Sequence, residues 1–133
     1  MNIIMNTDTS TVSIYTSLDS GKIGDTPMPV AYVVGAYRSK WGVIGRLINI
    51  LRARRVAIKY WQAGFGVYCP HMNTAFFDGK ADDSVWLKGN LAIIKRLKVK
   101  TDRVIVLPSW VNSEGSKGEI ALAKKRRLTI VYE

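Results

Sequence analysis

The sequence predicts an α/β protein with three layers, in which helices cover both faces of a parallel sheet of about four to five strands. Two observations support this prediction. Apolar runs of strand length alternate along the chain with longer segments of helical periodicity. The runs are also apolar at nearly every position, as expected of parallel strands that are buried on both faces. Strands and helices that alternate in this way form parallel sheets with crossover connections.

The repeating pattern begins at residue 30. Residues 30–34, VAYVV, form a short apolar run that ends at Gly35, which is typical of a buried strand. A helix is expected at residues 41–63, where apolar side chains recur at helical spacing: Ile44, Leu47, Ile48, Leu51, Ile58 and Trp61. Gly64 follows as a C-cap, and residues 66–69 form the next expected strand, which ends before Pro70.

The same pattern continues to the end of the chain. A second helix is expected at residues 83–98, because four side chains there share one helical face: Trp86, Asn90, Ile94 and Leu97. A strand at 103–107, a helix at 114–125 and a final strand at 128–132 complete the series. This order of elements predicts a flavodoxin-like or Rossmann-like domain at residues 30–133.

Residues 1–29 lack this pattern. They are rich in Ser, Thr, Gly and Asp and end in Pro27-Met28-Pro29, a segment that cannot continue a helix. We expect a flexible arm, to which a weak alternation at residues 11–18 can add one edge strand.

The composition indicates a single domain that stays inside the cell. The chain has 133 residues, of which 47% are hydrophobic, enough for a real core. Its single cysteine, Cys69, excludes an internal disulfide and fits a reducing compartment. No apolar run is long enough to span a bilayer, and the first residues lack the pattern of a signal peptide. We therefore expect a cytoplasmic protein without a membrane partner.

The charge is strongly positive and unevenly distributed. The net charge is +10, and no acidic residue lies between Asp25 and Asp78, where seven cations occur: Arg38, Lys40, Arg46, Arg52, Arg54, Arg55 and Lys59. Such a field attracts phosphates, nucleic acid or acidic partners. Cations at helix C-termini, such as Lys124 and Lys125, have a simpler explanation in the helix dipole. Nucleic-acid binding is therefore one option but not the leading one.

Three loops leave the carboxyl ends of the expected strands, at residues 35–40, 70–82 and 108–118, and they hold the unusual polar residues. Ligands of parallel sheets bind at that edge. In the last loop, Ser113 and Gly115 precede a helix, whose first N–H groups can bind a phosphate or carboxylate.

Glu119 lies in the first turns of this last helix and has two interpretations. The helix dipole favours its ionised form, and a partly buried carboxylate that faces a pocket can act as a nucleophile at an anomeric carbon. Alternatively, Ser116 and Glu119 match a capping box, in which Glu119 only closes the helix end. Spacing alone favours the cap.

The loop after the second strand adds candidates for ligand binding. His71 and Asn73 can hydrogen-bond a base, and Phe76 and Phe77 can stack on it or anchor the loop. A zinc site would need carboxylates beside Cys69 and His71, which are the only Cys and His of the chain, so we expect no metal. Because the chain has no dinucleotide, phosphate-loop, serine-hydrolase or zinc-protease motif, we also expect no cofactor.

Three segments, in this order, resemble motifs of the nucleoside 2-deoxyribosyltransferase-like superfamily, in particular of its small bacterial and phage proteins. The first is VVGAYRS, at the end of the first strand. The second is CPHMNTAFFDG, which is followed by the helix start Trp86-Leu87-Lys88-Gly89. The third is LPSWVNSEGSKGEIALA, in which four residues match the family pattern: Ser113, Gly115, Glu119 and Ile120. The resemblance covers residues 30–133.

The resemblance implies N-glycosidic chemistry on a deoxynucleoside or its 5′-monophosphate. Glu119 would attack the anomeric carbon and release the base, and water or another base would resolve the glycosyl-enzyme. The resemblance implies that Ser113 and Gly115 hold the sugar or a 5′-phosphate and that Tyr37 and Arg38 line the same pocket. The full set of candidate ligand-binding residues, from the resemblance and from residue chemistry together, is Gly35, Tyr37, Arg38, His71, Asn73, Asp78, Trp86, Ser109, Trp110, Ser113 and Gly115. Arg38 is the best phosphate ligand among them, because a guanidinium can bind phosphate with two hydrogen bonds.

One position departs from the family pattern. Related small proteins have Gly-Asp-Leu where this chain has Gly89-Asn90-Leu91. An amide does not titrate, so Asn90 cannot replace an acid that orients the substrate or transfers a proton. Asp78, Asp82 or Asp83 could instead be the acid that orients the substrate or transfers a proton. The candidate catalytic residues are therefore Glu119, Asn90 and Asp83.

Three functions stay open at this point. The leading one is an N-glycosidase or deoxyribosyltransferase, whose partners would be a small-molecule nucleoside or nucleotide and further copies of the chain. The homodimer or larger homo-oligomer is implied by the resemblance, because homologous enzymes complete each pocket with a neighbouring subunit. A non-catalytic nucleotide-binding or sequestering module would explain Asn90. A basic protein that binds nucleic acid or an acidic partner would explain the acid-free segment.

Overall fold

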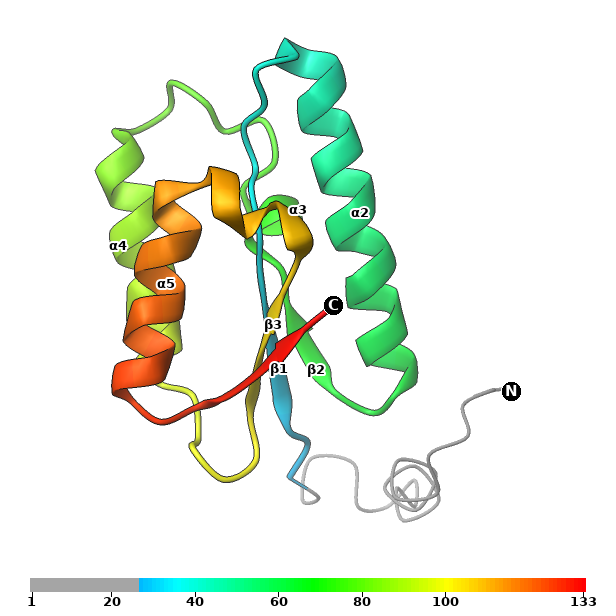
Figure 1. The fold of residues 1–133 in the computed structure, drawn as a ribbon, viewed down its shortest axis with the longest axis vertical. Helices are drawn as coiled ribbons and strands as arrows, with labels where there is room; N and C mark the ends of the chain where they lie inside the picture. The colour runs from blue at the N-terminus through cyan, green and yellow to red at the C-terminus, as the bar shows by residue number, and fades with distance from the viewer. Residues whose placement is uncertain (1–26) are drawn as a thin grey trace.

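Four parallel strands form the centre of the molecule in a computed structural model that describes residues 27–133 (Figure 1). The strand order is β2-β1-β3-β4. The strands are β1 (Val30–Val34), β2 (Gly66–Tyr68), β3 (Arg103–Val106) and β4 (Thr129–Tyr132). The edge strand considered at residues 11–18, like most of the expected arm at 1–29, lies outside the described residues.

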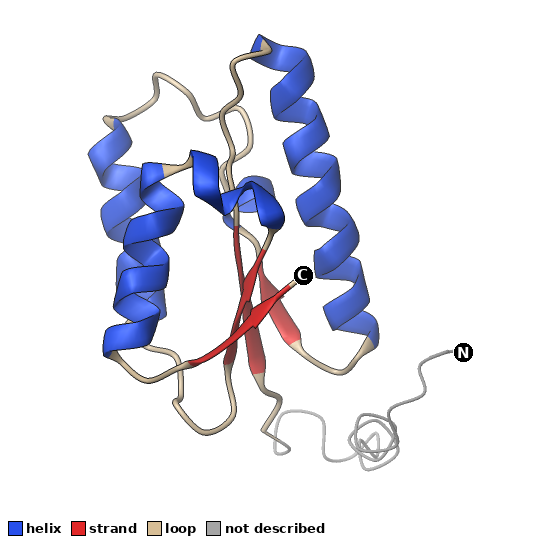
Figure 2. Cartoon of the chain, viewed as in Figure 1, coloured by secondary structure: helices blue, strands red, loops and turns tan. Residues whose placement is uncertain are grey.

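Helices cover both faces of this sheet, which confirms the predicted three-layer α/β/α fold (Figure 2). The long helix α2 (Gly42–Gln62) lies on one face, and the short helix α3 (Pro70–Asn73) packs against it. The helices α4 (Asp83–Ile94) and α5 (Glu114–Lys125) lie side by side on the other face. A 3-10 helix, η1 (Pro108–Asn112), leads from β3 to α5.

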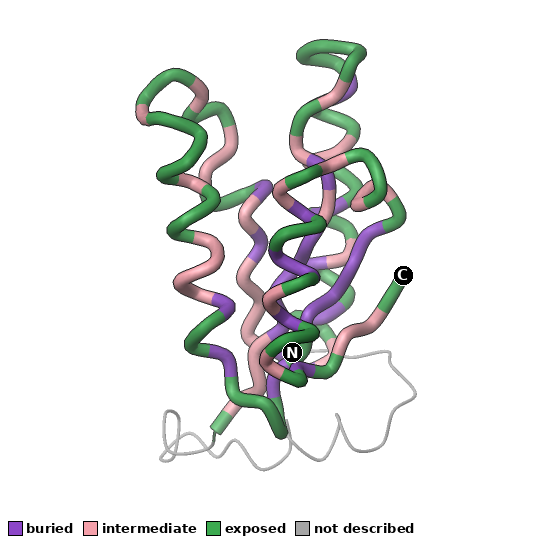
Figure 3. Tube along the Cα trace, turned by 60° about the vertical axis from the view of Figure 1, so that its left-hand side comes forward, coloured by how far each residue is buried: buried purple, intermediate pink, exposed green. Residues whose placement is uncertain are grey.

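The central strands are buried on both faces, as their apolar sequences predict, and Figure 3 shows the buried residues concentrated on the strands. Successive side chains alternate between the two faces. In β1, Tyr32 and Val34 pack in the core below α4 and α5, whereas Ala31 and Val33 pack on the side of α2. This alternation points Tyr32 towards α5.

A buried aspartate fixes the start of β1 beside the start of β3. Asp102 is 5% exposed, and its carboxylate accepts the backbone N–H of Val30 at 2.9 Å and that of Lys98 at 2.6 Å. Ala31 then lies opposite Arg103 in the parallel register. Because buried N–H groups need acceptors, Asp102 stabilises the entry to both strands.

The apolar stripe of α2 is not part of the core. Its six residues are 37% to 72% exposed, and we call them the outer face of α2: Ile44, Leu47, Ile48, Leu51, Ile58 and Trp61. The side of α2 that packs on the sheet has two small residues and one tyrosine, Ala53, Ala57 and Tyr60. Small side chains let the helix approach the sheet closely, so the large ones point outward. Although α2 is long, no helix within residues 27–133 is sufficiently long and apolar to cross a membrane.

The ends of several elements differ from the predictions. The helix expected at residues 83–98 ends at Ile94, where the Arg126 guanidinium donates to the carbonyl groups of Ile94 and Leu97. The segment expected to be a loop at residues 70–82 begins with α3, because Pro70 suits the first turn of a helix. Cys69 is the N-cap of α3, so β2 ends one residue earlier than predicted.

Candidate active site

A cavity of about 530 Å³ opens at the carboxyl ends of β1 and β3. From β1 the chain continues to β2 on one side of the sheet, and from β3 it continues to β4 on the other side, so the strand order reverses between β1 and β3. Parallel α/β proteins bind ligands at this position. All three predicted loops contribute to its wall. Most of the predicted site residues line it: Gly35, Tyr37, Arg38, His71, Asp78, Asp83, Trp86, Asn90, Ser113, Gly115 and Glu119.

Glu119 lies in the second turn of α5 and is 6% exposed. The Tyr32 hydroxyl, from the middle of β1, donates a hydrogen bond to Glu119 Oε1 at 3.0 Å. The Asn90 side chain, from α4, is a second hydrogen-bond partner of the carboxyl. Three elements from distant parts of the chain therefore hold one carboxyl group in the cavity wall.

The surroundings of Glu119 bring the pKa of its carboxyl group close to neutral pH. Burial raises its pKa to about 7, although the hydrogen bonds from Tyr32 and Asn90 act in the opposite direction. The helix dipole is expected to favour the ionised form of Glu119. The effect of burial on the pKa outweighs that of the dipole. A carboxyl with a pKa near 7 can act both as a carboxylate and as an acid under physiological conditions.

The capping-box interpretation of Glu119 is wrong. The helix begins at Glu114, and its N-cap is Ser113, whose hydroxyl accepts the N–H of Ser116 at 3.2 Å. Glu119 is thus too far along the helix to close its end, and its side chain faces Tyr32 instead. The carboxyl group is free of any capping role.

The first and second loops are joined through Asp78. Its Oδ2 atom accepts the Tyr37 hydroxyl at 3.3 Å and the Arg46 guanidinium at 3.1 Å. The Tyr37 hydroxyl also accepts the backbone N–H of Phe76 at 2.7 Å, and Arg46 lies over the Tyr37 ring. These contacts hold the second loop over the cavity. Phe77 continues the wall and meets the Trp86 ring edge to face, with ring centroids 5.9 Å apart.

Arg38 and Asp83 face each other at the mouth of the cavity. Their ion pair is 2.7 Å long, but the two side chains are 63% and 65% exposed. An exposed pair of this kind contributes little to stability, so an anionic ligand can displace Asp83 from the guanidinium at small cost. Both predicted roles, phosphate binding by Arg38 and proton transfer by Asp83, are compatible with this placement.

His71 is a neutral, deeply buried ring with an unused acceptor. It is 3% exposed, and its Nε2 atom donates to the Ala36 carbonyl at 3.0 Å. Burial lowers its pKa, so the ring stays neutral at pH 7. With the proton on Nε2, Nδ1 is a hydrogen-bond acceptor, and it has no partner among residues 27–133.

Three of the predicted residues lie elsewhere. Asn73 donates to the Tyr68 hydroxyl and lines a different hollow, beside α2. Ser109 accepts the N–H of Ala36 at 3.0 Å and so ties η1 to the first loop, without lining the cavity. Trp110 packs on the core against Tyr132, because the 3-10 turn of η1 directs it away from the opening. Their positions in the sequence were close to the site, but their side chains turn away from it.

Sequence reasoning missed two residues. The run VAYVV indicates Tyr32 only as part of a buried strand, yet Tyr32 is the hydrogen-bond donor to Glu119. A single tyrosine in the run VAYVV was a usable signal, because a buried hydroxyl needs a partner. The sequence indicates Ser116 only as half of a capping box, whereas in the structure it lines the cavity and is 2% exposed.

Cys69 and His71, the two residues considered for a zinc site, have different surroundings. Cys69 packs in the core below α2, whereas His71 bonds to the first loop. Within residues 27–133, no three His, Cys, Asp or Glu side chains come together in a group that could hold a metal ion.

Comparisons with known proteins identify a family. No curated protein and no solved structure matches the chain. Residues 53–132 match the family described as Domain of unknown function (DUF4406), which covers more than half of the chain and includes α3, α4 and α5. Glu119, Asn90 and His71 lie within the matched residues. The chain therefore belongs to the DUF4406 family.

Proposed function

We propose that this protein acts on the N-glycosidic bond of a deoxynucleoside or its 5′-monophosphate, as an N-glycosidase or deoxyribosyltransferase with Glu119 as the nucleophile. The observation that supports it most is the buried Glu119 carboxyl in a cavity of about 530 Å³, held by Tyr32 and Asn90. Cavities of this size accept ligands as large as a nucleotide.

Glu119, Asp83 and a water molecule or second base each have a role in the proposed reaction. An oxygen of ionised Glu119 attacks the anomeric carbon, and the bond from that carbon to the base breaks. The base leaves with the electron pair of the bond and takes up a proton from solvent, which Asp83 in the cavity wall can pass on once the ligand has displaced it from Arg38. Water or a second base then attacks the same carbon and frees Glu119, so the configuration of the sugar is retained.

Binding would use the remaining walls. The N-terminus of α5, with Ser113 and Gly115, and the exchangeable guanidinium of Arg38 are suited to a 5′-phosphate. The ring edges of Phe77 and Trp86 offer an apolar surface to a base.

Base release from deoxynucleosides and their 5′-monophosphates, measured by chromatography at high enzyme concentration, tests this proposal. Wild type should release base and Glu119→Gln should not, while both bind ligand in a thermal-shift assay. Glu133→Gln is the control, because Glu133 does not line the cavity. Wild type that releases no base from any of these compounds would contradict the proposal.

A non-catalytic nucleotide-binding module is the second candidate, and Asn90 favours it. The Asn90 amide contacts Glu119 at a place where the resembling proteins have an acid. In that case wild type and Glu119→Gln would both bind nucleotide without releasing base. The same pair of measurements therefore separates the two functions.

A further inference from the structure

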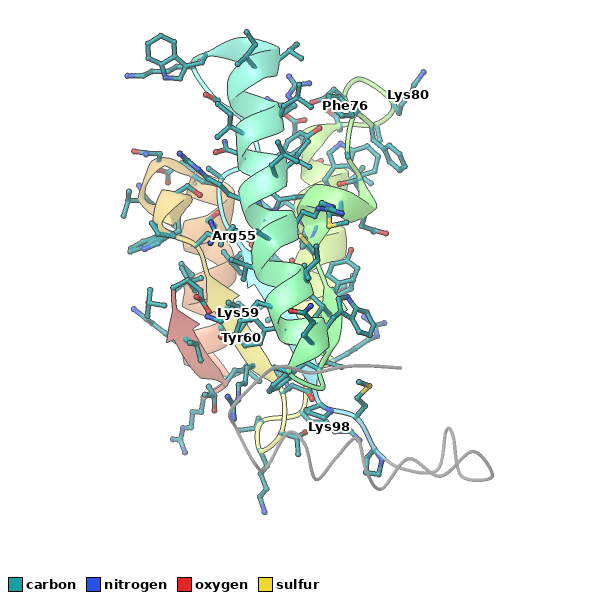
Figure 4. All side chains as sticks on the ribbon, turned by 90° about the vertical axis from the view of Figure 1, so that its right-hand side faces the viewer. Arg55, Lys59, Tyr60, Phe76, Lys80 and Lys98 are labelled. Atoms are coloured by element: carbon teal, nitrogen blue, oxygen red, sulfur yellow. The ribbon has the colours of Figure 1, made fainter. Side chains whose placement is uncertain are left out.

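Exposed cations gather where the chain enters β3 and β4. One turn, residues 95–102, joins α4 to β3, and another, residues 126–128, joins α5 to β4. The cations lie on these turns and on the end of α5, and we call them the basic edge: Lys95, Arg96, Lys98, Lys100, Lys124, Lys125 and Arg127. Figure 4 shows Lys98 at the opposite end of the molecule from Phe76 and Lys80 of the second loop. The basic edge is therefore remote from the candidate active site.

The structure holds the two turns side by side. The strands β3 and β4 are hydrogen-bonded neighbours, so the turns that lead into them start from the same edge of the sheet. The Arg126 guanidinium, from the second turn, donates to the carbonyl groups of Ile94 at 2.5 Å and Leu97 at 3.2 Å, at the start of the first. Leu97 and Leu128 belong to the same core cluster. Cations from distant parts of the chain therefore form one surface.

The positive charge of this surface is not balanced within residues 27–133. None of the seven side chains forms an ion pair there. Asp102 is the single acidic residue of the two turns, and its carboxylate already accepts the backbone N–H groups of Val30 and Lys98. The helix dipoles favour cations at these ends, but two helix C-termini together amount to about one negative charge. An excess of positive charge remains, and it attracts polyanions.

Arg127 has a backbone conformation in which glycine is the usual residue. Its φ is 60°, and it directly follows Arg126, the C-cap of α5. The N–H groups of Arg127 and Leu128 bond to the carbonyl groups of Lys124 and Ala123, both at 3.0 Å, which is the Schellman pattern. A Cβ atom at this position costs stability, because it crowds the neighbouring carbonyl. An arginine at a strained position indicates a role other than stabilising the fold.

We infer that the basic edge binds the phosphate backbone of a nucleic-acid duplex without reading its sequence. Lysine and arginine neutralise phosphates, and phosphate contacts carry no sequence information. Neither turn contains an aromatic residue on which the bases of a single strand could stack. Val99 is the one large apolar side chain exposed on the two turns, whereas binding to a membrane surface uses apolar side chains as well as charge.

This binding is independent of the proposed glycosidase activity. The cavity opens at the carboxyl ends of β1 and β3, and no side chain of the basic edge lines it. A duplex bound at the amino ends of β3 and β4 leaves the cavity accessible. Glu119→Gln should therefore bind a duplex as wild type does, and a failure of one proposal would leave the other standing.

Fluorescence anisotropy with labelled DNA duplexes of about 20 base pairs tests the inference on the full chain. Two duplexes of unrelated sequence should bind equally well at low salt. The logarithm of the binding constant should fall with the logarithm of the salt concentration, with a slope of about −3 or steeper, because each phosphate contact releases counterions.

Paired substitutions distinguish a defined surface from net charge. Lys98→Gln combined with Lys100→Gln should weaken duplex binding by about tenfold at low salt and make the slope shallower by about 2. Base release by this variant should equal that of wild type. Arg52→Gln combined with Arg55→Gln removes the same charge from exposed positions of α2 and is the matched control. It should bind the duplex within about twofold of wild type.

Arg127 allows a test in which binding and stability change in opposite directions. Arg127→Gly should weaken duplex binding by about threefold and raise the midpoint of denaturant unfolding, because glycine adopts this φ without strain. Arg127→Lys keeps both the charge and the strain, so it should match wild type in both measurements. A glycine variant that becomes more stable without losing affinity would exclude Arg127 from the binding surface.

Three results would overturn the inference. One is the absence of duplex binding at low salt, or binding that does not respond to salt. Another is an equal loss of affinity in the two paired variants, since net charge alone would then account for binding. The third is binding to vesicles of phosphatidylcholine and phosphatidylserine that requires Lys98 and Lys100, without binding to either duplex, which would identify an anionic membrane as the partner.

Discussion

The Tyr32 hydroxyl donates a hydrogen bond of 3.0 Å to Glu119 Oε1 across 87 residues of chain. Tyr32 comes from the central strand β1, and Glu119 comes from α5, which covers that face of the sheet. Burial of Tyr32 raises its pKa, and the nearby carboxyl raises it further, so the phenol keeps its proton and stays a donor. The pair therefore links the core directly to the cavity, and it is the basis of the first two predictions.

Replacing Tyr32 with Phe should raise the pKa of Glu119 above its value of about 7. The hydroxyl lowers this pKa, and Phe keeps the ring but removes the donor. The titration of the Glu119 carboxyl by carbon NMR measures the change. Tyr60→Phe is the control, since it removes a hydrogen bond to Glu133 outside the cavity. An unchanged Glu119 titration in Tyr32→Phe would contradict the assigned hydrogen bond.

The stability of wild type relative to Glu119→Gln should fall as the pH rises from about 4.5 to about 7. Burial raises the pKa of the folded-state carboxyl from 4.5 to about 7, so the folded protein binds this proton more tightly than the unfolded chain does. Protonation therefore stabilises the fold, and this stabilisation is lost as the carboxyl ionises. The loss should be on the order of 3 kcal/mol.

Denaturant unfolding at a series of pH values measures this effect as the difference between the two proteins. His71 has the opposite influence, because burial lowers its pKa and stability is lost as the pH falls. Both proteins contain His71, so its contribution largely cancels in the difference. Parallel stability curves from pH 4.5 to 7.5 would show that Glu119 titrates normally.

Replacing Asn90 with Asp should create a coupled pair of carboxyls. Asn90 bonds to Glu119, and a second carboxylate in contact with the buried Glu119 carboxylate opposes its ionisation, so one of the two apparent pKa values should rise above about 7. The related small proteins have an Asp at this position. If that Asp takes part in catalysis, the rate of base release should increase in Asn90→Asp, and the pH at which the rate is highest should rise. Asn73→Asp, outside the cavity, should leave the titration of Glu119 unchanged.

Replacing Gly35 with Ala should destabilise the protein by about 1 to 3 kcal/mol. A Cβ atom at Gly35 would lie 2.7 Å from Cδ1 and 3.0 Å from Cβ of buried Leu107, where β1 leads into the first loop of the site. Gly89→Ala is the matched comparison, because nothing lies within 4 Å and the residue is inside α4. It should stabilise by about 0.5 to 1 kcal/mol. Chemical denaturation compares both with wild type.

The placement of the elements could be predicted because their signals are local. The apolar run at Val30–Val34 and the shared face of Trp86, Asn90 and Ile94 each indicate one kind of element without reference to the rest of the chain. Parallel strands bring their carboxyl ends to one edge, so the meeting of three loops around Glu119 followed from the order of the elements.

The direction of individual side chains could not be predicted in the same way. An apolar stripe such as that of α2 is typical of a buried face, yet Ala53 and Ala57 pack on the sheet and Leu51 is 60% exposed. Periodicity identifies a helix with an apolar side, but it does not say whether that side meets the sheet or a partner. Trp110 likewise follows β3, as a site residue would, but its half-buried side chain packs against the core and not in the cavity.

The sequence by itself determined the order of strands and helices, the positive charge of α2 and the edge at which a ligand site would form, because patterning and chain direction decide these. Only the tertiary structure decided that Glu119 meets Tyr32 and Asn90 rather than capping a helix. That pairing depends on how α4 and α5 pack over β1. The raised pKa of Glu119 has the same origin, since it arises from burial among groups that are distant along the chain.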